Sequence, residues 1–386
     1  MRRFTCGDRI GSKLPARDRP HTGRFSAEMS PGGKKGLDRR DFLGLGAGAA
    51  GLFCSLKLSD VEKLNSRDIK RIDAAAASLK KPQRKEARDV VDNYTFATPE
   101  PAPGGQIREY WIQATSVLWN PSPTGHDQWM NMDVPSKRYR AFVYQEMTTG
   151  FASPLSPASI PGPTLEAEVG DVLRVHFRNA DRKFFQAVTM HPHGVRYNPE
   201  YDGAYYGDFT RDGGFIGPGE EFTYTWEATK DSVGAWPYHD HGPNHVLNLT
   251  RGLYGSIIIR PKGARKPDRE YFLHLGSVFP SVSGLDSMIH TVNGRAYAGN
   301  TPTLRAKVGE KVAIHVFGMN NDFHTFHMHG HRWPGPGGAS TDSPTVGPSE
   351  TATVKFTEDN PGRYLYHCHV AGHQDAGMSG WYLVEK

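Results

Sequence analysis

Cysteine is scarce in this sequence: only Cys6, Cys54 and Cys368 occur among its 386 residues. We expect residues 1–56 to be a leader, and its removal would leave Cys368 alone, which excludes a disulfide framework in the mature chain. An unbroken apolar run of about 18 residues is also missing, so no transmembrane helix is predicted. Because a histidine flanks Cys368 on each side, we interpret it as a metal ligand rather than a structural thiol.

The part of the chain that we expect to fold, which follows residue 90, has no surplus of basic residues. Residues 1–90 hold 21 Lys and Arg and 11 Asp and Glu, which leaves 25 of the 46 basic and 30 of the 41 acidic residues for the remainder. The remainder is therefore mildly acidic, and its charge gives no basis for nucleic-acid binding.

The first hundred residues have features of an exported chain. Arg39 and Arg40 precede Phe-Leu and the mildly apolar run 44–56, a pattern typical of a twin-arginine export signal. The leader 1–56 therefore predicts export by that route to a periplasmic, cell-surface or extracellular location. Residues 57–104 are charged, rich in alanine and Pro-rich at their end, and we interpret them as a linker or N-terminal arm with few apolar positions to bury.

Short β-prone runs separated by turns begin near residue 105. They cover residues 110–118, 138–144, 164–177, 222–226 and 255–259, and the sequence contains 43 Gly and 28 Pro. Regular spacing of this kind predicts an all-β fold, with a sandwich or barrel in each of two domains, 105–264 and 265–386.

A repeated sequence block defines these two domains. Residues 163–179 (PTLEAEVGDVLRVHFRN) match residues 302–320 (PTLRAKVGEKVAIHVFGMN), and each block is followed by His-x-His-Gly and then by Tyr-His-x-His. Successive side chains on a strand point to opposite faces, so both imidazoles of a pair share one face. The four pairs contain His191, His193, His239, His241, His327, His329, His367 and His369.

Cys368 lies at the end of a predicted strand. Because successive side chains on a strand point to opposite faces, its side chain points away from those of the two histidines beside it. A Cys thiolate, two His and a weak axial Met are the ligands of a blue-copper electron-transfer site. His373 and Met378 follow Cys368 at intervals of five residues. The remaining histidine is His324, because its odd spacing from the next His-x-His pair lets it face Cys368 while that pair faces away.

The motifs HPHG, YHDH, HTFHMHGH and HCHVAGHQDAGM together resemble the four copper motifs of multicopper oxidases. The phrase HTFHMHGHRW and the two-domain length resemble the small two-domain bacterial laccases. The resemblance covers roughly residues 105–386 and implies two tandem cupredoxin-like domains, each a Greek-key β-sandwich.

This resemblance implies four coppers per chain, one of type 1, one of type 2 and two of type 3. Its implied ligands are His324, Cys368, His373 and Met378 for type 1, His191 and His327 for type 2, and His193, His239, His241, His329, His367 and His369 for the type 3 pair. Cys368 would take an electron from the donor, and its backbone neighbours would lead by a short covalent path to the trinuclear cluster. Four such electrons would reduce dioxygen to water.

Domain one is a degenerate copy at the positions that correspond to the blue-copper site. Val188 and Asp240 stand there in place of the first histidine and the cysteine, so we expect no type 1 copper in this domain. His245 stands at the third position and is interpreted as a relic or a structural hydrogen-bonding residue. Three further histidines match no ligand position: His274, His290 and His331.

The resemblance also implies a homotrimer, in which each cluster takes four histidines from domain one of one subunit and four from domain two of its neighbour. It implies proton delivery by Asp202 on the type 2 side, although an Asp before Gly is also an ordinary turn residue. Tyr197 follows His193 closely, and a donor of electrons or hydrogen bonds and a packing tyrosine are equally good interpretations of it.

The predicted function is that of a laccase, which oxidises phenols or aromatic amines by single electrons and passes them to dioxygen. The axial Met378 predicts a modest potential and therefore easily oxidised phenols. An alternative is a metal-ion oxidase for Cu(I), Mn(II) or Fe(II), but a Met-rich run is missing, since 129–132 is short and lies in domain one. A copper electron carrier without oxidase activity would not need the complete ligand set. A copper nitrite reductase would have its type 1 Cys in domain one, where Asp240 stands.

Overall fold

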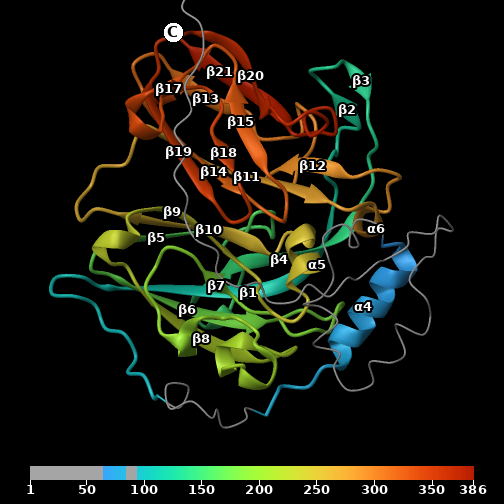
Figure 1. The fold of residues 1–386 in the computed structure, drawn as a ribbon, viewed down its shortest axis with the longest axis vertical. Coiled ribbons are helices and arrows are strands. Elements are labelled where there is room, and N and C mark those ends of the chain that lie inside the picture. Colours follow the sequence, from blue (N-terminus) through green and yellow to red (C-terminus); the bar gives the residue numbers. More distant parts are fainter. Residues whose placement is uncertain (1–63, 84–93) are drawn as a thin grey trace, which may run out of the picture. The chain divides into compact units, whose positions relative to one another are not determined.

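The computed structural model describes residues 64–83 and 94–386, so the leader and its arginine pair lie outside the described residues. Two β-sandwiches follow each other along this part of the chain (Figure 1). The main strands of domain 1 are β1 (Ile107–Trp119), β4 (Tyr139–Met147), β5 (Thr164–Glu168), β6 (Val172–Asn179), β7 (His191–Pro192), β8 (Glu221–Glu227), β9 (Gly234–His239) and β10 (Tyr254–Arg260). Those of domain 2 are β11 (Arg269–Val278), β12 (Ile289–Val292), β13 (Leu304–Lys307), β14 (Lys311–Gly318), β15 (His324–Met328), β18 (Thr345–Val346), β19 (Thr351–Thr357), β20 (Gly362–Cys368) and β21 (Ser379–Glu385).

Shorter elements occupy the connections between these strands. The helices in the described residues are α4 (Ser66–Ser78), which precedes β1, α5 (His245–Arg251) and α6 (Pro280–Ser283). Two small hairpins are β2 (His126–Asp127) with β3 (Met132–Asp133) and β16 (Trp333–Pro334) with β17 (Ser340–Thr341). Single 3-10 turns lie at Thr149–Phe151, Pro199–Tyr201, Gly207–Phe209, Asp212–Gly214, Lys230–Ser232 and Pro336–Gly338. None of the helices in the described ranges is long and apolar enough to span a membrane.

The two sandwiches share one connectivity. Domain 1 has the strand orders β4-β1-β6-β8 and β5-β10-β9-β7, and domain 2 has β12-β11-β14-β19 and β13-β21-β20-β15-β18. The parallel pairs also correspond, since β1 with β6 matches β11 with β14, and β5 with β10 matches β13 with β21. The predicted all-β fold with two tandem sandwiches is confirmed, and the sequence repeat is a repeat of structure.

The predicted run 164–177 proves to be two strands in different sheets, whereas each of the other predicted runs corresponds to one strand. The break falls at Gly170, whose φ of +98° suits glycine. Next to it, the carboxylate of Asp171 accepts hydrogen bonds from the backbone N–H groups of Glu168 and Gln106. This turn sends β6 to the opposite layer of the sandwich.

Each sandwich encloses its own core, built from the inward-facing side chains of both sheets. In β6 the side chains alternate between buried and half-buried from Arg174 onward, as period two requires. Two tyrosines complete the cores and mark the repeat: Tyr238 Oη donates to the carbonyl of Pro163 at 2.8 Å, and Tyr366 Oη donates to that of Pro302 at 2.6 Å. Each tyrosine thus ties the strand carrying the second histidine pair to the start of the repeated block.

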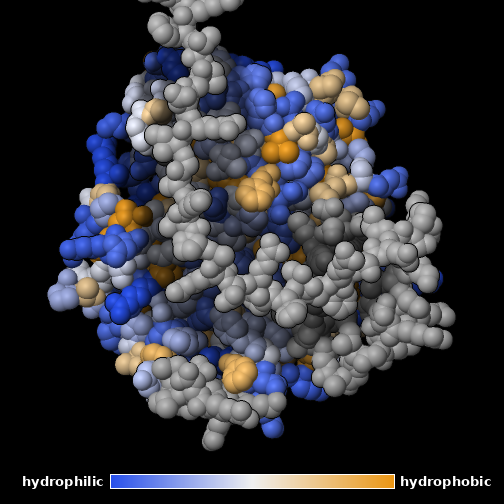
Figure 2. All heavy atoms as spheres, in the orientation of Figure 1, coloured by the Kyte–Doolittle hydropathy of each residue, from blue (hydrophilic) through white to orange (hydrophobic). Residues whose placement is uncertain are grey.

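The β2–β3 hairpin of domain 1 extends onto domain 2 (Figure 1). The backbone N–H of Gln128 donates to Ala298 at 2.9 Å, and Trp119 Nε1, just before the hairpin, donates to the Gly294 carbonyl at 2.6 Å. Met130 in this hairpin is half exposed. Figure 2 shows apolar side chains scattered among hydrophilic ones on this part of the surface. The short 129–132 run therefore directly follows a part of domain 1 that contacts domain 2.

The segment interpreted as a linker or arm contains a packed helix, α4. Asn65 caps it, because its side chain accepts from the N–H of Asp68, whose carboxylate accepts from the N–H of Asn65 in return. Its apolar face packs against α5 and the start of α6 and comprises Ile69, Ile72 and Ala76, which meet Leu247 and Phe279. A bidentate ion pair at 2.7 and 2.9 Å joins Asp73 to the buried Arg251. The apolar face of α4 is therefore buried.

Candidate metal centres

The histidine pairs of each domain lie side by side on antiparallel strands. In domain 1, β7 pairs with β9 so that His191 is opposite His239. In domain 2, β15 pairs with β20 so that His327 is opposite His367. The same register in both domains places two His-x-His pairs on one face, so each domain presents a group of four histidines. We call these the domain 1 quartet (His191, His193, His239, His241) and the domain 2 quartet (His327, His329, His367, His369).

A glycine follows the first pair in each domain for a steric reason. Gly194 has a φ of +71°, and a Cβ there would meet Trp236 at about 2.0 Å. Gly330 has a φ of +72°, and a Cβ there would meet Tyr364 at 2.9 Å. The backbone can leave the histidine pair this tightly only where the side chain is a single hydrogen.

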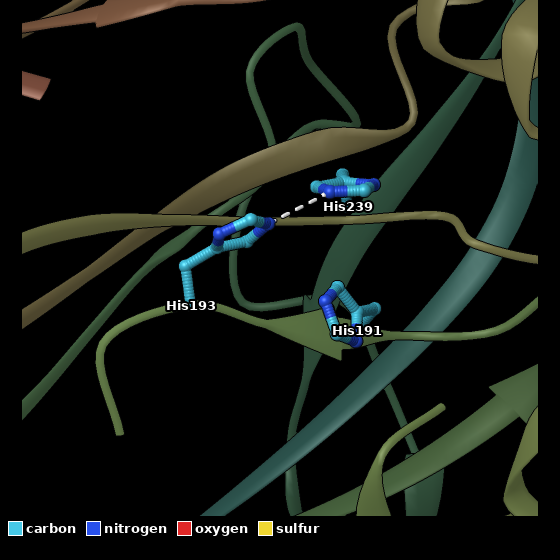
Figure 3. A group of neighbouring side chains, drawn as sticks. All are labelled: His191, His193 and His239. Atoms are coloured by element: carbon cyan, nitrogen blue, oxygen red, sulfur yellow. Dashed lines mark hydrogen bonds between the residues drawn. The ribbon is translucent and has the colours of Figure 1, made fainter. Parts of the chain in front are cut away.

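The domain 1 quartet has its ring nitrogens turned toward one another. His193 Nε2 lies 3.0 Å from His239 Nε2, and the ring of His191 lies within 5.5 Å of both, measured between centroids (Figure 3). His241 completes the group at 5.1 Å from His191 and 5.9 Å from His239. Three of these side chains bring nitrogen atoms within 4.8 Å of one another, which is close enough to share a metal ion.

The domain 2 quartet repeats this arrangement. His329 Nε2 lies 3.2 Å from His367 Nε2, and His327 lies 5.4 Å from His329 and 5.3 Å from both His367 and His369. His327, His329 and His367 form a second group with convergent nitrogen atoms. Two facing imidazole nitrogens share at most one proton, so a cation between them is the arrangement that satisfies both lone pairs.

Backbone carbonyls orient the rings in the same way in both quartets. The Nδ1 of His239 lies 2.8 Å from the Asp240 carbonyl, and that of His367 lies 3.0 Å from the Cys368 carbonyl. His191 and His327 likewise place Nδ1 on the carbonyls of Asp202 at 2.7 Å and Asp342 at 3.0 Å. An Nδ1–H donated to a carbonyl leaves the Nε2 lone pair free for a metal, which is the usual outer support of a histidine ligand.

Burial keeps most of these histidines neutral. Burial, with a smaller contribution from neighbouring imidazoles, lowers the pKa of His193, His241 and His367 to about 4 each. Burial and His193 lower the pKa of His239 as well. Neutral imidazole is the form that binds metals, so these rings are ready to coordinate a cation at neutral pH.

Cys368 lies on the opposite face of β20 among the other predicted ligands. Its Sγ lies 3.6 Å from His373 Nδ1 and 3.9 Å from His324 Nδ1. Met378 is fully buried in the same core cluster, and its carbonyl accepts the N–H of Cys368 at 3.1 Å. The buried His324 Nε2 has no hydrogen-bond partner among the described residues. A thiol, two Nδ1 atoms and a methionine are the donor set that fits a type 1 copper.

Two residues outside the predicted motifs surround His373. The ring of His290, on β12, stacks on His373 with a centroid separation of 3.9 Å and an interplanar angle of 19°. The carboxylate of Asp322 lies 3.8 Å from His373 Nε2, and the Asp322 side chain is 39% exposed. Beside it, Phe323 is 63% exposed. The Nε2 edge of His373 is therefore bordered by a partly exposed carboxylate.

In domain 1, the position that corresponds to Cys368 holds a hydrogen-bonded carboxylate in place of a metal ligand. Asp240 stands where Cys368 stands in domain 2, and it is fully buried. Its carboxylate accepts from the N–H groups of Thr189 at 2.8 Å and Gly242 at 3.1 Å, and from Asn248 Nδ2 at 2.9 Å. These donors use the lone pairs that a metal would need, and the aliphatic Val188 lies at the place of the first histidine.

Asp202 and Tyr197 lie beside His191. The Asp202 carboxylate approaches His191 Nδ1 at 3.2 Å and accepts from the exposed Tyr206 Oη at 2.8 Å. Burial alone would raise the pKa of Asp202, but the hydrogen bonds from His191 and Tyr206 outweigh it and lower that pKa. The ring of Tyr197 lies 5.9 Å from that of His191, and burial together with Asp202 raises the pKa of Tyr197 to about 12. Tyr206 thus links Asp202 to the surface.

Several residues of these sites could not be found by motif. Asp342 is the domain 2 counterpart of Asp202, since its carbonyl and carboxylate lie 3.0 and 3.8 Å from His327 Nδ1. The sequence offers only a faint signal for Asp342: it follows His327 by 15 residues, whereas Asp202 follows His191 by 11, so the two intervals are similar but not equal. For His290 and Asp322 no spacing signal exists. Their place beside His373 depends on long-range packing.

The two quartets do not meet within one chain. In residues 64–83 and 94–386, no ring contact joins a histidine of one quartet to a histidine of the other, and no group of convergent metal-ligating atoms takes members from both. The described structure therefore presents the eight histidines as two separate groups of four.

The depressed histidine pKa values predict a pH-dependent stability of the metal-free protein. An unfolded histidine has a pKa of about 6.5, whereas His193, His241 and His367 reach only about 4 when folded. Between these values the unfolded state binds more protons, so stability should fall as the pH falls. We expect the Tm of the metal-free protein to drop from pH 6.5 to 5, measured by calorimetry.

A variant with His193 and His241 both changed to Gln should show a shallower drop over the same range, because two of the titrating groups are gone. An unchanged or rising Tm of the metal-free wild type from pH 6.5 to 5 would show that folding does not depress the pKa of these histidines.

Comparison with known proteins places these sites in a family. Two sequence models, each of the multicopper oxidase family, match residues 155–264 and residues 277–386, and together they cover more than half of the chain. Ferroxidase HEPHL1 from Homo sapiens is 28% identical over 372 residues, which is 78% of this chain and 31% of that protein. The chain thus spans about a third of the length of this relative.

Solved structures show the same architecture. A crystal structure of a multicopper oxidase is 25% identical, with a TM-score of 0.58 over 75% of this chain and 93% of that one. A copper nitrite reductase from Nitrosomonas europaea is 21% identical, with a TM-score of 0.54 over 73% of this chain and 94% of that one, which is a likeness of fold. The resemblance found in the sequence is confirmed: this chain belongs to the multicopper oxidase family and consists of two cupredoxin domains.

Proposed function

We propose that this protein is a laccase-type oxidase, which takes single electrons from phenols or aromatic amines and uses four of them to reduce dioxygen to water. The observation that carries the proposal is the position of Cys368 between two sets of ligands. Its side chain faces His324 and His373, and its two sequence neighbours belong to the domain 2 quartet. Copper bound at these sites would supply the one-electron redox steps and the activation of dioxygen.

The residues of the chain have distinct roles in this proposal. His324, Cys368, His373 and Met378 would hold the type 1 copper. His191 and His327 would hold type 2, and the remaining quartet histidines would hold the type 3 pair, which makes four coppers per chain. Covalent bonds alone connect the Cys368 thiol with its neighbouring histidines, so electrons need not cross a gap between side chains.

Proton supply at the type 2 side is assigned to Asp202. Its carboxylate contacts His191 and accepts from Tyr206, which is 59% exposed, so a chain of hydrogen bonds extends from solvent to the quartet. Tyr197 packs against His191 within the domain 1 core and is placed to donate a hydrogen bond to Asp202. We therefore propose that Tyr197 holds Asp202 in position.

The complete cluster is proposed to form between subunits of a homotrimer. The two quartets are separate groups within the described residues, and each is built on two neighbouring strands of one sheet. If domain 1 of each subunit contacts domain 2 of the next, the repeated contact can close into a ring. We propose that this ring contains three copies. Export through the twin-arginine route, predicted from Arg39 and Arg40, would deliver the protein folded.

The proposal predicts a blue protein. Copper loading should give about four coppers per chain and an intense absorption near ~600 nm that arises from the Cys368 thiolate. Cys368→Ser should lose the blue band and the oxidation of phenols, while its quartets keep copper. Metal analysis, visible spectra and EPR measure these outcomes. A blue protein with about one copper per chain would leave an electron carrier without oxidase activity.

Mixed trimers test whether the cluster is shared. His193→Ala disables the domain 1 quartet and His329→Ala disables the domain 2 quartet, so each variant alone should be inactive. Co-expression with two affinity tags and tandem purification yields trimers that contain both variants. Each such ring has one interface with two intact quartets, so about one third of the wild-type rate should return. Inactivity of the mixed trimers would show that the cluster is not built between subunits.

A metal-ion oxidase is a second candidate because of Asp322. This carboxylate lies 3.8 Å from His373 Nε2 at a partly exposed edge, where it would attract a divalent cation. The ferroxidase activity in the name of the human relative belongs to that protein, but it makes Fe(II) the first metal ion to test.

Asp322→Asn distinguishes the two candidates. If Fe(II) is the donor, loss of the charge should lower kcat/KM for Fe(II) by about tenfold, because near-surface Coulomb attraction to the cation disappears. The rate with a neutral phenol should stay nearly constant. Asp375→Asn is the matched control, since Asp375 is an exposed acid of the 369–378 loop. An equal loss with both substrates would instead indicate damage to His373.

A further inference from the structure

His290 belongs to no copper motif, yet it makes the tightest ring contact in the described part of the chain. Its imidazole lies parallel to that of His373, with 3.9 Å between centroids and 19° between planes. The next closest ring pair, His274 with Phe317, is separated by 4.4 Å. His290 is only 7% exposed, so this contact is part of the interior.

The two stacked rings differ in how firmly the backbone holds them. His290 is on β12, in register with Ser277 of β11, and its Nδ1 lies 2.8 Å from Ser277 Oγ. Its backbone N–H donates to the Ala376 carbonyl at 2.9 Å. His373 lies in the loop after β20, where turns replace regular strand pairing. A ring anchored in a sheet thus covers the face of a ring carried by a loop.

Ligation by His290 itself is disfavoured by the orientation of the rings. His290, Asp322 and His373 have potential ligand atoms within 4.8 Å of one another. The lone pairs of an imidazole lie in the plane of the ring, however, and two parallel stacked rings direct them side by side. They cannot converge on one ion at the ~2.0 Å distance of a metal–nitrogen bond.

We infer that His290 is a positioning residue for the Cys368 site: its ring clamps His373 face-on, fixes Nδ1 toward Cys368, and closes that face of the site to water. The inference rests on the proposed function, in that the site holds a type 1 copper. Aromatic pairs in offset stacks restrict each other's rotation and exclude solvent. Exclusion of water favours the less charged, reduced form of a bound ion, so the stack raises the reduction potential.

Two substitutions isolate the contribution of the ring. His290→Phe and His290→Leu both fill the space and both lose the Ser277 hydrogen bond, but only phenylalanine retains a ring. We expect the phenylalanine variant to match the wild type in blue absorption, copper hyperfine splitting and reduction potential. In the leucine variant the potential should fall, changing the ratio of oxidised to reduced protein against a redox mediator by about two- to tenfold, and the hyperfine splitting should change.

Other outcomes separate the possible failures. Equal potentials in the phenylalanine and leucine variants would overturn the inference, whether both match the wild type or both differ from it. His290→Gln is a second ring-free variant that can still bond to Ser277, and it should behave like leucine. The Tm of each metal-free variant reports stability separately from potential. A wild-type protein without a blue band would refute the proposed function, whereas a blue wild type with an unaffected leucine variant refutes only the role of His290.

Discussion

The alternation of side chains along β20 is the constraint on which both kinds of candidate site depend. Cys368 points into the core toward His324 and His373, whereas its neighbours His367 and His369 point to the quartet. A shift of the strand by one residue would exchange the two faces and destroy both sites. The pairing of β20 with β15 and β21, and the bond from Tyr366 Oη to Pro302, hold this register. The packing that stabilises the domain is therefore also what keeps the redox ligands apart from the quartet.

The duplicated domain shows which parts of such a site can change independently. Both domains keep the register of the histidine pairs, the tyrosine bond to a proline carbonyl, and the carbonyl acceptors on Nδ1. Only domain 2 keeps a cysteine on the other face. In domain 1, Asp240 takes that position and is satisfied by Thr189, Gly242 and Asn248. A buried carboxylate with three donors is a stable replacement for a metal site, so one face could lose its ligands while the quartet behind it stayed intact.

Specific contacts join the two sandwiches within one chain. The β2–β3 hairpin reaches domain 2 through bonds such as that from Gln128 to Ala298, and α4 packs against both Leu247 of domain 1 and Phe279 of domain 2. These contacts leave the two quartets apart. In the proposed trimer, a quartet of one subunit and a quartet of the neighbouring subunit would together bind copper. The convergent lone pairs of each quartet would then be directed at a metal ion.

The sequence by itself determined the features that depend on short spacing. The interval of two residues within each His-x-His pair and the interval of five after Cys368 are local, so strand geometry converts them directly into faces and ligand sets. The repeated sequence block likewise predicted a duplication, and the two sandwiches have the same connectivity. The tertiary structure alone decided the surroundings of His373. His290 arrives from β12 and Asp322 from the loop before β15, and the separation of the quartets follows from the packing of whole domains. Contacts of this kind depend on how sheets stack, and spacing along the chain carries no information about that.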